Sequence, residues 1–162
     1  MKKVSVLFVC LGNICRSPTA HGVFQKFVDD AGLSTQIIVD SAGTSGWHIG
    51  EPPDKRSAAA ALKVGYDLSN LRGRKAVKQD FEHFDYVLAM DEANLVELET
   101  LRPSGYTGHL GLFLDFSTEK NYREVPDPYY GNGDGFKLVL SLVEDASMNL
   151  LSHIKEKHFQ AL

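Results

Sequence analysis

The segment that most constrains the fold is an apolar run, Val4–Val9, followed at once by a short loop and a helical pattern. The run is rich in β-branched residues, which indicates a strand buried on both faces. Ser17 is expected to cap the following helix, with Pro18 at its first position. Apolar residues then recur at the spacing of one helix face, at Ala20, Val23, Phe24, Phe27 and Val28.

The alternation of strand and helix continues along the chain. Further strands are expected at 36–40, 86–90 and 109–113, and further helices at 54–64, from Asp91 to before Pro103, and from about Gly135. Such alternation predicts an α/β fold with a doubly wound, four-stranded parallel sheet and helices on both faces. Ligands of such sheets bind beyond the carboxyl ends of the strands, which is where Cys10 would lie.

The loop between the first strand and the first helix has the composition of an anion site that contains a nucleophile. Backbone N–H groups of such a loop converge on one point, and the helix dipole adds positive potential there. Arg16 supplies a planar fork of donors that suits phosphate. The thiolate of Cys10 would act as the nucleophile. We therefore expect phosphate and other oxyanions to bind to Arg16 and to the loop residues Leu11, Gly12, Asn13, Ile14 and Cys15.

Length and composition limit the class of protein. The 162 residues suffice for one domain, expected at 1–162. The net charge of −4 argues against nucleic acid as a partner, and no apolar run reaches the ~20 residues that cross a membrane. Two cysteines make no secreted disulfide framework, so a cytoplasmic protein is expected. The six histidines form no recognisable metal set and no dinucleotide motif is present, so neither a metal nor a cofactor is expected.

A long irregular segment, 116–134, is typical of a functional loop and contains Asp127-Pro-Tyr-Tyr130. This tetrapeptide and the N-terminal string Val9-Cys-Leu-Gly-Asn-Ile-Cys-Arg-Ser-Pro18 resemble the low-molecular-weight protein tyrosine phosphatases, over essentially the whole chain. The resemblance implies a flavodoxin-like fold and hydrolysis of phosphotyrosine monoesters through a cysteinyl-phosphate, without a cofactor. Tyrosine-phosphorylated proteins would be the partners.

The resemblance also implies roles for residues outside the loop. Asp127 would be the general acid, because a positioned carboxylic acid can protonate the leaving phenolate. Trp47, Tyr129 and Tyr130 would form the walls of a pocket for a flat aromatic ester. If Asp127 is not the acid, the next candidates are Asp134, Asp115 and Glu124.

Within the loop, the resemblance implies supporting contacts. The Ser17 hydroxyl would hydrogen-bond the Cys10 sulfur, and Asn13, helped by Ser41, would lock the loop. Cys15 is either structural or a redox partner, since a second thiol can trap an oxidised nucleophile as a disulfide.

Three other functions share parts of this pattern. A thioredoxin-coupled arsenate reductase needs additional cysteines to relay a disulfide, and the chain has only two. A protein-arginine phosphatase has threonine at the position of Ile14. A phosphoprotein-binding module without catalysis is disfavoured by the joint presence of Cys10, Arg16 and Asp127.

A few positions bear on details around the site rather than on the reaction. His21 and Leu71 depart from the family pattern. Asp54 and Asp91 match family positions and are expected to be structural.

Overall fold

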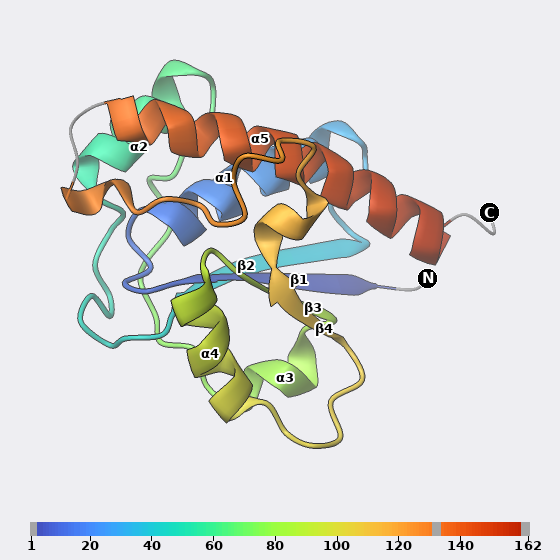
Figure 1. Ribbon diagram of the computed structural model, residues 1–162. Coiled ribbons are helices and arrows are strands. Elements are labelled where there is room, and N and C mark those ends of the chain that lie inside the picture. Colours follow the sequence, from blue (N-terminus) through green and yellow to red (C-terminus); the bar gives the residue numbers. More distant parts are fainter. Residues whose placement is uncertain (1–2, 131–133, 160–162) are drawn as a thin grey trace.

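The computed structural model describes residues 3–130 and 134–159 and consists of a parallel sheet between two layers of helices (Figure 1). The strands are β1 Val4–Cys10, β2 Ile37–Gly43, β3 Tyr86–Ala89 and β4 His109–Leu112. The helices are α1 Arg16–Asp30, α2 Lys55–Lys63, α3 Asp80–His83, α4 Glu92–Leu101 and α5 Asp134–Ile154. The short 3-10 turns are η1 Phe113–Phe116 and η2 Pro128–Tyr130, and the π-helical turn η3 Lys155–Phe159 continues α5.

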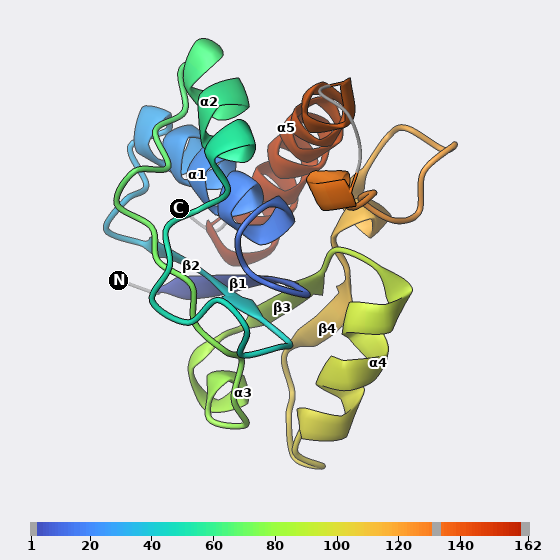
Figure 2. The ribbon, with the colours of Figure 1, turned by 90° about the vertical axis from the view of Figure 1, so that its left-hand side faces the viewer.

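The helices cover both faces of the sheet. Helices α1, α2 and α5 lie on one face, and α3 and α4 lie on the other, in both views of the ribbon (Figures 1 and 2). All strand pairs are parallel, in the order β2-β1-β3-β4. The predicted doubly wound, four-stranded parallel sheet is therefore confirmed.

The strand order places Cys10 at a topological switch point. From β1 the chain first crosses to β2 at one edge, and then returns past β1 to build β3 and β4 on its other side. The connections therefore leave β1 in opposite directions, which opens a crevice at its carboxyl end. Cys10 is the last residue of β1 and pairs with Gly43 at the end of β2.

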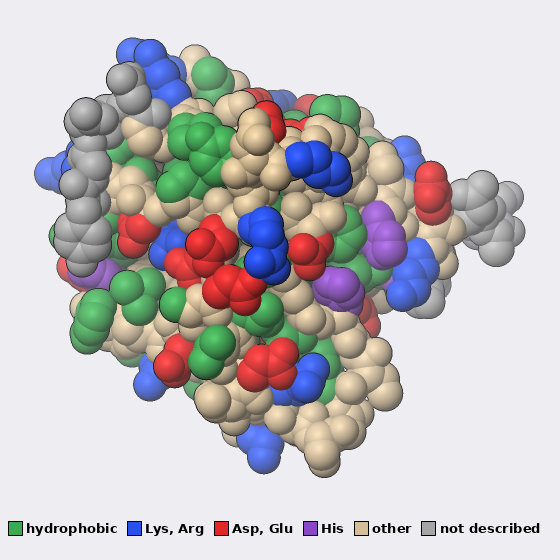
Figure 3. All heavy atoms as spheres, in the orientation of Figure 1, with side chains coloured by type: hydrophobic (Ala, Val, Ile, Leu, Met, Phe, Trp, Pro, Cys, Tyr) green, Lys and Arg blue, Asp and Glu red, His purple; other side chains and the backbone are tan. Residues whose placement is uncertain are grey.

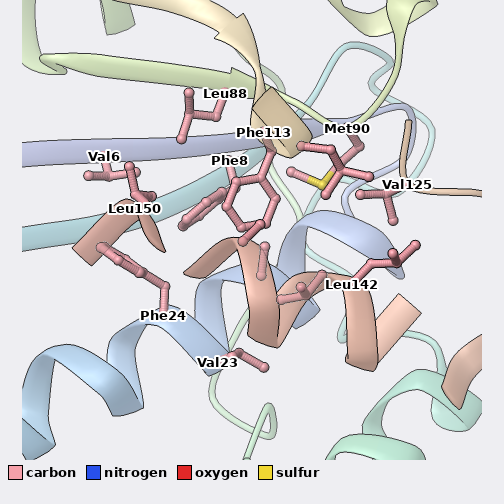
Figure 4. Packing of buried hydrophobic residues seen from close by; sticks show 14 of the residues in the cluster. Val6, Phe8, Val23, Phe24, Leu88, Met90, Phe113, Val125, Leu142 and Leu150 are labelled. Atoms are coloured by element: carbon pink, nitrogen blue, oxygen red, sulfur yellow. The ribbon is translucent and has the colours of Figure 1, made fainter. Parts of the chain in front are cut away.

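The side chains of β1 alternate between two apolar cores. Val6 and Phe8 belong to the core formed with α1 and α5, whereas Leu7 and Val9 belong to the core on the opposite face. The packing around Phe8 is shown in Figure 4. Its ring makes edge-to-face contacts with the rings of Phe24, at 5.7 Å, and Phe113, at 4.9 Å. Burial on both faces explains why the segment reads as a continuous apolar run.

The prediction that Ser17 caps the first helix is wrong. Helix α1 begins at Arg16, one residue before Ser17, and Cys15 occupies the cap position without a side-chain hydrogen bond. Ser17 lies in the first turn, and its hydroxyl contacts the Cys10 sulfur and the Ala42 carbonyl instead. Pro18 remains tolerated, because the first N–H groups of a helix have no partner within the helix.

Other boundaries shift slightly. Strand β2 continues to Gly43 rather than ending at Asp40, because its pairing with β1 extends to Cys10. The short helix α3 was not expected from the sequence. It is held by Asp80, whose carboxylate accepts hydrogen bonds from the Val77 N–H and the Arg74 guanidinium.

Phe8→Ala should lower the free energy of unfolding by about 3–5 kcal/mol, because it removes a fully buried ring between two layers. Urea denaturation followed by circular dichroism measures this change. Ile38→Ala, at a side chain 46% exposed on β2, is the control and should change stability by about 0.5 kcal/mol or less. Equal losses for the two variants would contradict the assignment of Phe8 to the centre of the core.

Candidate active site

The loop after β1 directs hydrogen-bond donors at the Cys10 sulfur. The Asn13 N–H donates to Sγ at 3.3 Å, and the Ser17 hydroxyl oxygen lies 3.0 Å from Sγ. When the sulfur is a thiolate, both groups can donate to it. The predicted contact between Ser17 and Cys10 is present in the structure.

Asn13 holds the loop in shape. Its φ of 58° lies in the left-handed region, which asparagine tolerates better than most residues. Its side-chain NH₂ group donates to the Ser17 hydroxyl at 2.8 Å, and its side-chain oxygen Oδ1 accepts from the backbone N–H of Arg74 at 3.0 Å. Asn13 thus joins the loop to α1 and to the segment around Arg74.

Ser41, expected to help Asn13, has a different partner. Its hydroxyl pairs with Nδ1 of His21 at 3.1 Å. Burial lowers the pKa of His21, so a neutral imidazole is favoured there. His21, which departs from the family pattern, therefore joins α1 to β2 through Ser41.

Gly43 is a part of the site that sequence reasoning missed. A Cβ at this position would lie 2.8 Å from the Leu11 carbonyl oxygen and 3.1 Å from the Asn13 nitrogen. The end of β2 therefore approaches the loop backbone more closely than a side chain would allow. The N–H groups of Thr44 and Ser45 donate to the carbonyls of Cys10 and Leu11 across this contact. The sequence signal was the small pair Ala42-Gly43 at the end of a strand.

Arg16 is a buried cation held by anionic partners from other elements. Its guanidinium donates to Asp91 at 2.6 Å and to the Val125 carbonyl at 3.1 Å, and lies 3.5 Å from Asp127. Burial by itself would lower the pKa of Arg16, but the negative charges of Cys10, Asp91 and Asp127 raise it. The side chain therefore stays charged although only 3% of the residue is exposed.

Asp91 has a second contact that fixes its position. Its other carboxylate oxygen accepts from the Asn94 N–H at 2.8 Å and so caps α4. A helix N-terminus stabilises a carboxylate in this position. Asp91 therefore joins α4 to the guanidinium of Arg16.

Asp127 is the acidic residue in the described part of the chain that lines the same pocket as Cys10. Its carboxylate accepts from the Tyr129 N–H at 3.0 Å, which orients it within the loop before η2. Of the alternative acids, Asp115 lies on η1, and Glu124 accepts from the Glu92 N–H at 2.7 Å, outside this pocket. The side chain of Asp134 is outside the described residues.

The pocket is a small cavity of about 40 Å³. It is lined by most of the predicted residues: Cys10, Leu11, Gly12, Ile14, Cys15, Arg16, Trp47, Asp127 and Tyr129. Asn13 and Ser17 contact Cys10 as described above, and the side chain of Tyr130 is outside the described residues. Leu71 packs against the apolar core instead of lining the pocket.

His48 also lines the pocket and was not singled out from the sequence. Its ring approaches Gly12, where a Cβ would lie 3.0 Å from His48 Cδ2, and its Nδ1 lies 2.5 Å from a carboxylate oxygen of Glu51. The one available signal was its place beside Trp47 in a glycine-rich loop.

Within 3–130 and 134–159, no group of three or more His, Cys, Asp or Glu side chains could hold a metal ion. Across the same residues, no helix is long and apolar enough to cross a membrane.

The chain is similar to known phosphatases over nearly its whole length. The family profile described as "Low molecular weight phosphotyrosine protein phosphatase" matches residues 5–160. The low molecular weight phosphotyrosine protein phosphatase of Schizosaccharomyces pombe is 42% identical over 154 residues, which cover 94% of this chain and 98% of the relative.

Solved structures show the same similarity. A protein tyrosine phosphatase from Entamoeba histolytica with Hepes in its active site has a TM-score of 0.91 and 41% identity, and the match covers 95% of this chain and 98% of that one. The Drosophila arginine phosphatase has a TM-score of 0.88 and 33% identity, covering 97% and 99% of the two chains.

The two cysteines should differ sharply in reactivity. Burial raises the pKa of Cys15 to about 12, so at neutral pH it is a thiol, and the thiolate is the form that is alkylated. We therefore expect iodoacetate at neutral pH to label Cys10 and to spare Cys15, and inorganic phosphate to protect Cys10. Peptide mass mapping measures both effects. Equal labelling of the two cysteines, or labelling unaffected by phosphate, would contradict the anion-loop interpretation.

Proposed function

Since the chain belongs to the low molecular weight protein tyrosine phosphatase family, hydrolases that cleave phosphotyrosine through a cysteinyl-phosphate, we propose that Cys10, Arg16 and Asp127 perform this reaction. The observation that carries the assignment is their convergence on one pocket at the carboxyl end of β1. Cys10 and Arg16 flank one short loop, and Asp127 comes from a distant part of the chain. In this arrangement they supply a nucleophile, an anion binder and a proton donor.

In the first step the Cys10 thiolate attacks phosphorus. The S–P bond forms, the bond from phosphorus to the tyrosine oxygen breaks, and the Asp127 carboxylic acid gives its proton to the leaving oxygen. Arg16 and the loop N–H groups hold the three equatorial oxygens, over which charge is spread in the transition state. Tyrosine leaves, and phosphate remains bonded to sulfur.

In the second step water attacks the cysteinyl-phosphate. The Asp127 carboxylate takes a proton from the water, an O–P bond forms, and the S–P bond breaks to release phosphate. The Ser17 hydroxyl, 3.0 Å from Sγ, donates to the thiolate as it leaves. At the end of the cycle Cys10 is again a thiolate and Asp127 is again a carboxylic acid.

The walls of the pocket favour an aromatic ester. Tyr129 lines the pocket with its side chain partly exposed, and Trp47 is 72% exposed at the mouth, so both present flat apolar surfaces to a phosphorylated tyrosine. Ile14, which stands where arginine phosphatases carry threonine, lines the same pocket. We propose tyrosine-phosphorylated proteins of the cytoplasm as substrates, and no role for nucleic acid in a chain of net charge −4.

We further propose that Cys15 is a redox partner of Cys10. Both cysteines are free and line one pocket. If peroxide converts Cys10 to a sulfenic acid, the Cys15 thiol condenses with it: the S–S bond forms, and the Cys15 proton and the sulfenic hydroxyl leave together as water. This disulfide would protect Cys10 from further oxidation.

Asp127→Ala should lower the rate with phosphotyrosine by about 10²–10⁴-fold. Phenolate from tyrosine has a conjugate-acid pKa of about 10 and needs the proton, so the loss with p-nitrophenyl phosphate should be smaller. The basic limb of the pH–rate profile should disappear with the acid that it reports. Steady-state kinetics on both substrates measures this, with Asp115→Ala as the matched control. Equal losses on both substrates with an unchanged pH profile would show that another residue is the acid.

Brief peroxide treatment should inactivate the enzyme reversibly, with an intramolecular disulfide between Cys10 and Cys15 detectable by mass spectrometry. A thiol reductant should restore activity to the parent but not to Cys15→Ser, in which Cys10 can oxidise further. Recovery of Cys15→Ser to the same extent as the parent would exclude the protective role.

A further inference from the structure

A second hollow lies beside the catalytic pocket, between α2 and the N-terminal half of α5. The two helices run next to each other in both ribbon views (Figures 1 and 2). The hollow has a volume of about 400 Å³, and its floor is apolar, formed by Ala60, Val64, Phe136 and Leu140. We call it the α2–α5 groove. Figure 3 shows the face of the molecule on the other side of α5, where acidic and basic side chains lie close together.

The rim of the α2–α5 groove is cationic. Arg56, Lys63 and Lys137 line it together with one carboxylate, that of Glu144, and Arg56 is paired with Asp54 at its base, so the two lysines carry the excess charge. The Glu144 carboxylate already accepts a hydrogen bond from the Tyr66 hydroxyl at 2.6 Å. A surplus of positive charge on a chain of net charge −4 is a local feature that favours an anionic partner.

Arg56 connects the α2–α5 groove to the catalytic pocket. Its guanidinium donates to the Tyr129 carbonyl at 3.0 Å, and Tyr129 is a wall of the catalytic pocket. The guanidinium carbon lies 5.5 Å from the centre of the Tyr129 ring and 5.0 Å from that of Phe136, within the range of cation–π contacts. The groove therefore begins where the wall of the pocket ends.

The base of α2 is also tied to the catalytic loop. Asp54 caps α2 and binds the Arg56 guanidinium through two hydrogen bonds, at 3.2 and 3.1 Å. The Asp54 N–H donates to the Ile14 carbonyl at 2.8 Å. A peptide that places its phosphate on the loop is therefore held at a defined position relative to the groove.

We propose that the α2–α5 groove binds the stretch of substrate polypeptide next to the phosphotyrosine, and that it selects a large apolar residue flanked by acidic residues. This inference rests on the proposed function. The apolar side chain would be buried on Phe136 and Leu140, and the carboxylates would face Lys63 and Lys137 at the rim. Affinity would then come from burial, and selection among sequences from charge.

The test compares three substrates: p-nitrophenyl phosphate, a phosphotyrosyl peptide with an acidic and apolar flank, and the same peptide with lysines in place of the acidic residues. The unmodified enzyme should prefer the acidic peptide in kcat/KM. In Lys63→Glu/Lys137→Glu, kcat/KM for the acidic peptide should fall about three- to tenfold, the strength of two exposed ion pairs, and should rise for the lysine peptide. Activity on p-nitrophenyl phosphate should not change. The preference should shrink at high salt.

A matched double reversal elsewhere is the control. Lys78→Glu/Lys155→Glu makes the same change in net charge at two exposed lysines outside the groove and should leave the peptide preference intact. Val64→Asp, at a side chain 56% exposed on the floor, should weaken the acidic peptide without affecting p-nitrophenyl phosphate.

The outcomes separate this inference from the proposed function. Lack of hydrolysis of all three substrates by the unmodified enzyme would overturn the proposed function. Normal hydrolysis with equal kcat/KM for the two peptides, or equal effects of both double reversals, would overturn the groove inference alone. A loss in Lys63→Glu/Lys137→Glu that is as large for p-nitrophenyl phosphate as for the peptide would also overturn it, because the effect would then lie in the catalytic pocket.

Discussion

The buried guanidinium of Arg16 is the interaction on which the site depends. A cation removed from water is costly unless anions and carbonyl oxygens surround it. Here Asp91 at the start of α4, the Val125 carbonyl and Asp127 provide that environment. These contacts join the start of α1, the start of α4 and the loop before η2, three segments that are far apart in the sequence. A neutral residue at position 16 would leave the carboxylates of Asp91 and Asp127 without this counter-ion.

The two aspartates beside Arg16, Asp91 and Asp127, are held in different ways. Asp91 is engaged on both oxygens, by Arg16 and by the Asn94 N–H, and it does not line the pocket of Cys10, so its contacts serve to hold the guanidinium. Asp127 lies farther from the guanidinium, at 3.5 Å, and lines the pocket. Such a contact is compatible with the proton-donor role proposed for it. The two aspartates beside one arginine therefore differ in their distance from the guanidinium.

The loop after β1 keeps its shape because the backbone of β2 approaches it closely. Gly43 lets the end of β2 contact the loop, and Asn13 takes a left-handed conformation that turns the chain toward the sulfur. Both features shape the loop around the Cys10 sulfur, to which the Asn13 N–H donates. The α2–α5 groove extends this logic outward, since Arg56 is shared between the cap of α2, the Tyr129 wall and the groove. The site that binds phosphate and the groove that binds the surrounding polypeptide would then be connected through the contacts of Arg56.

Much of the fold could be predicted because strands and helices leave local patterns of apolar residues in the sequence. Burial of β1 on both faces appears as a continuous apolar run, and helical stripes mark α1 and α5, so the parallel α/β class and the position of Cys10 at a strand end followed directly. Boundaries were less secure. Ser17 has the composition of a helix cap, yet its hydroxyl contacts the Cys10 sulfur, because a partner brought by the fold outweighs a local preference.

The sequence by itself predicted the chemistry of the loop, since cysteine, backbone amides and arginine within seven residues are the groups that an anion site with a nucleophile needs. The resemblance already pointed to Asp127, and the tertiary structure brings it to the pocket of Cys10. Only the tertiary structure decided why Gly43 is needed, that His48 joins the pocket and that Ser41 pairs with His21. The physical reason is range. Strand periodicity and loop chemistry act between near neighbours in the chain, whereas the contacts of Arg16 with Asp91, Val125 and Asp127 exist only after distant segments have packed.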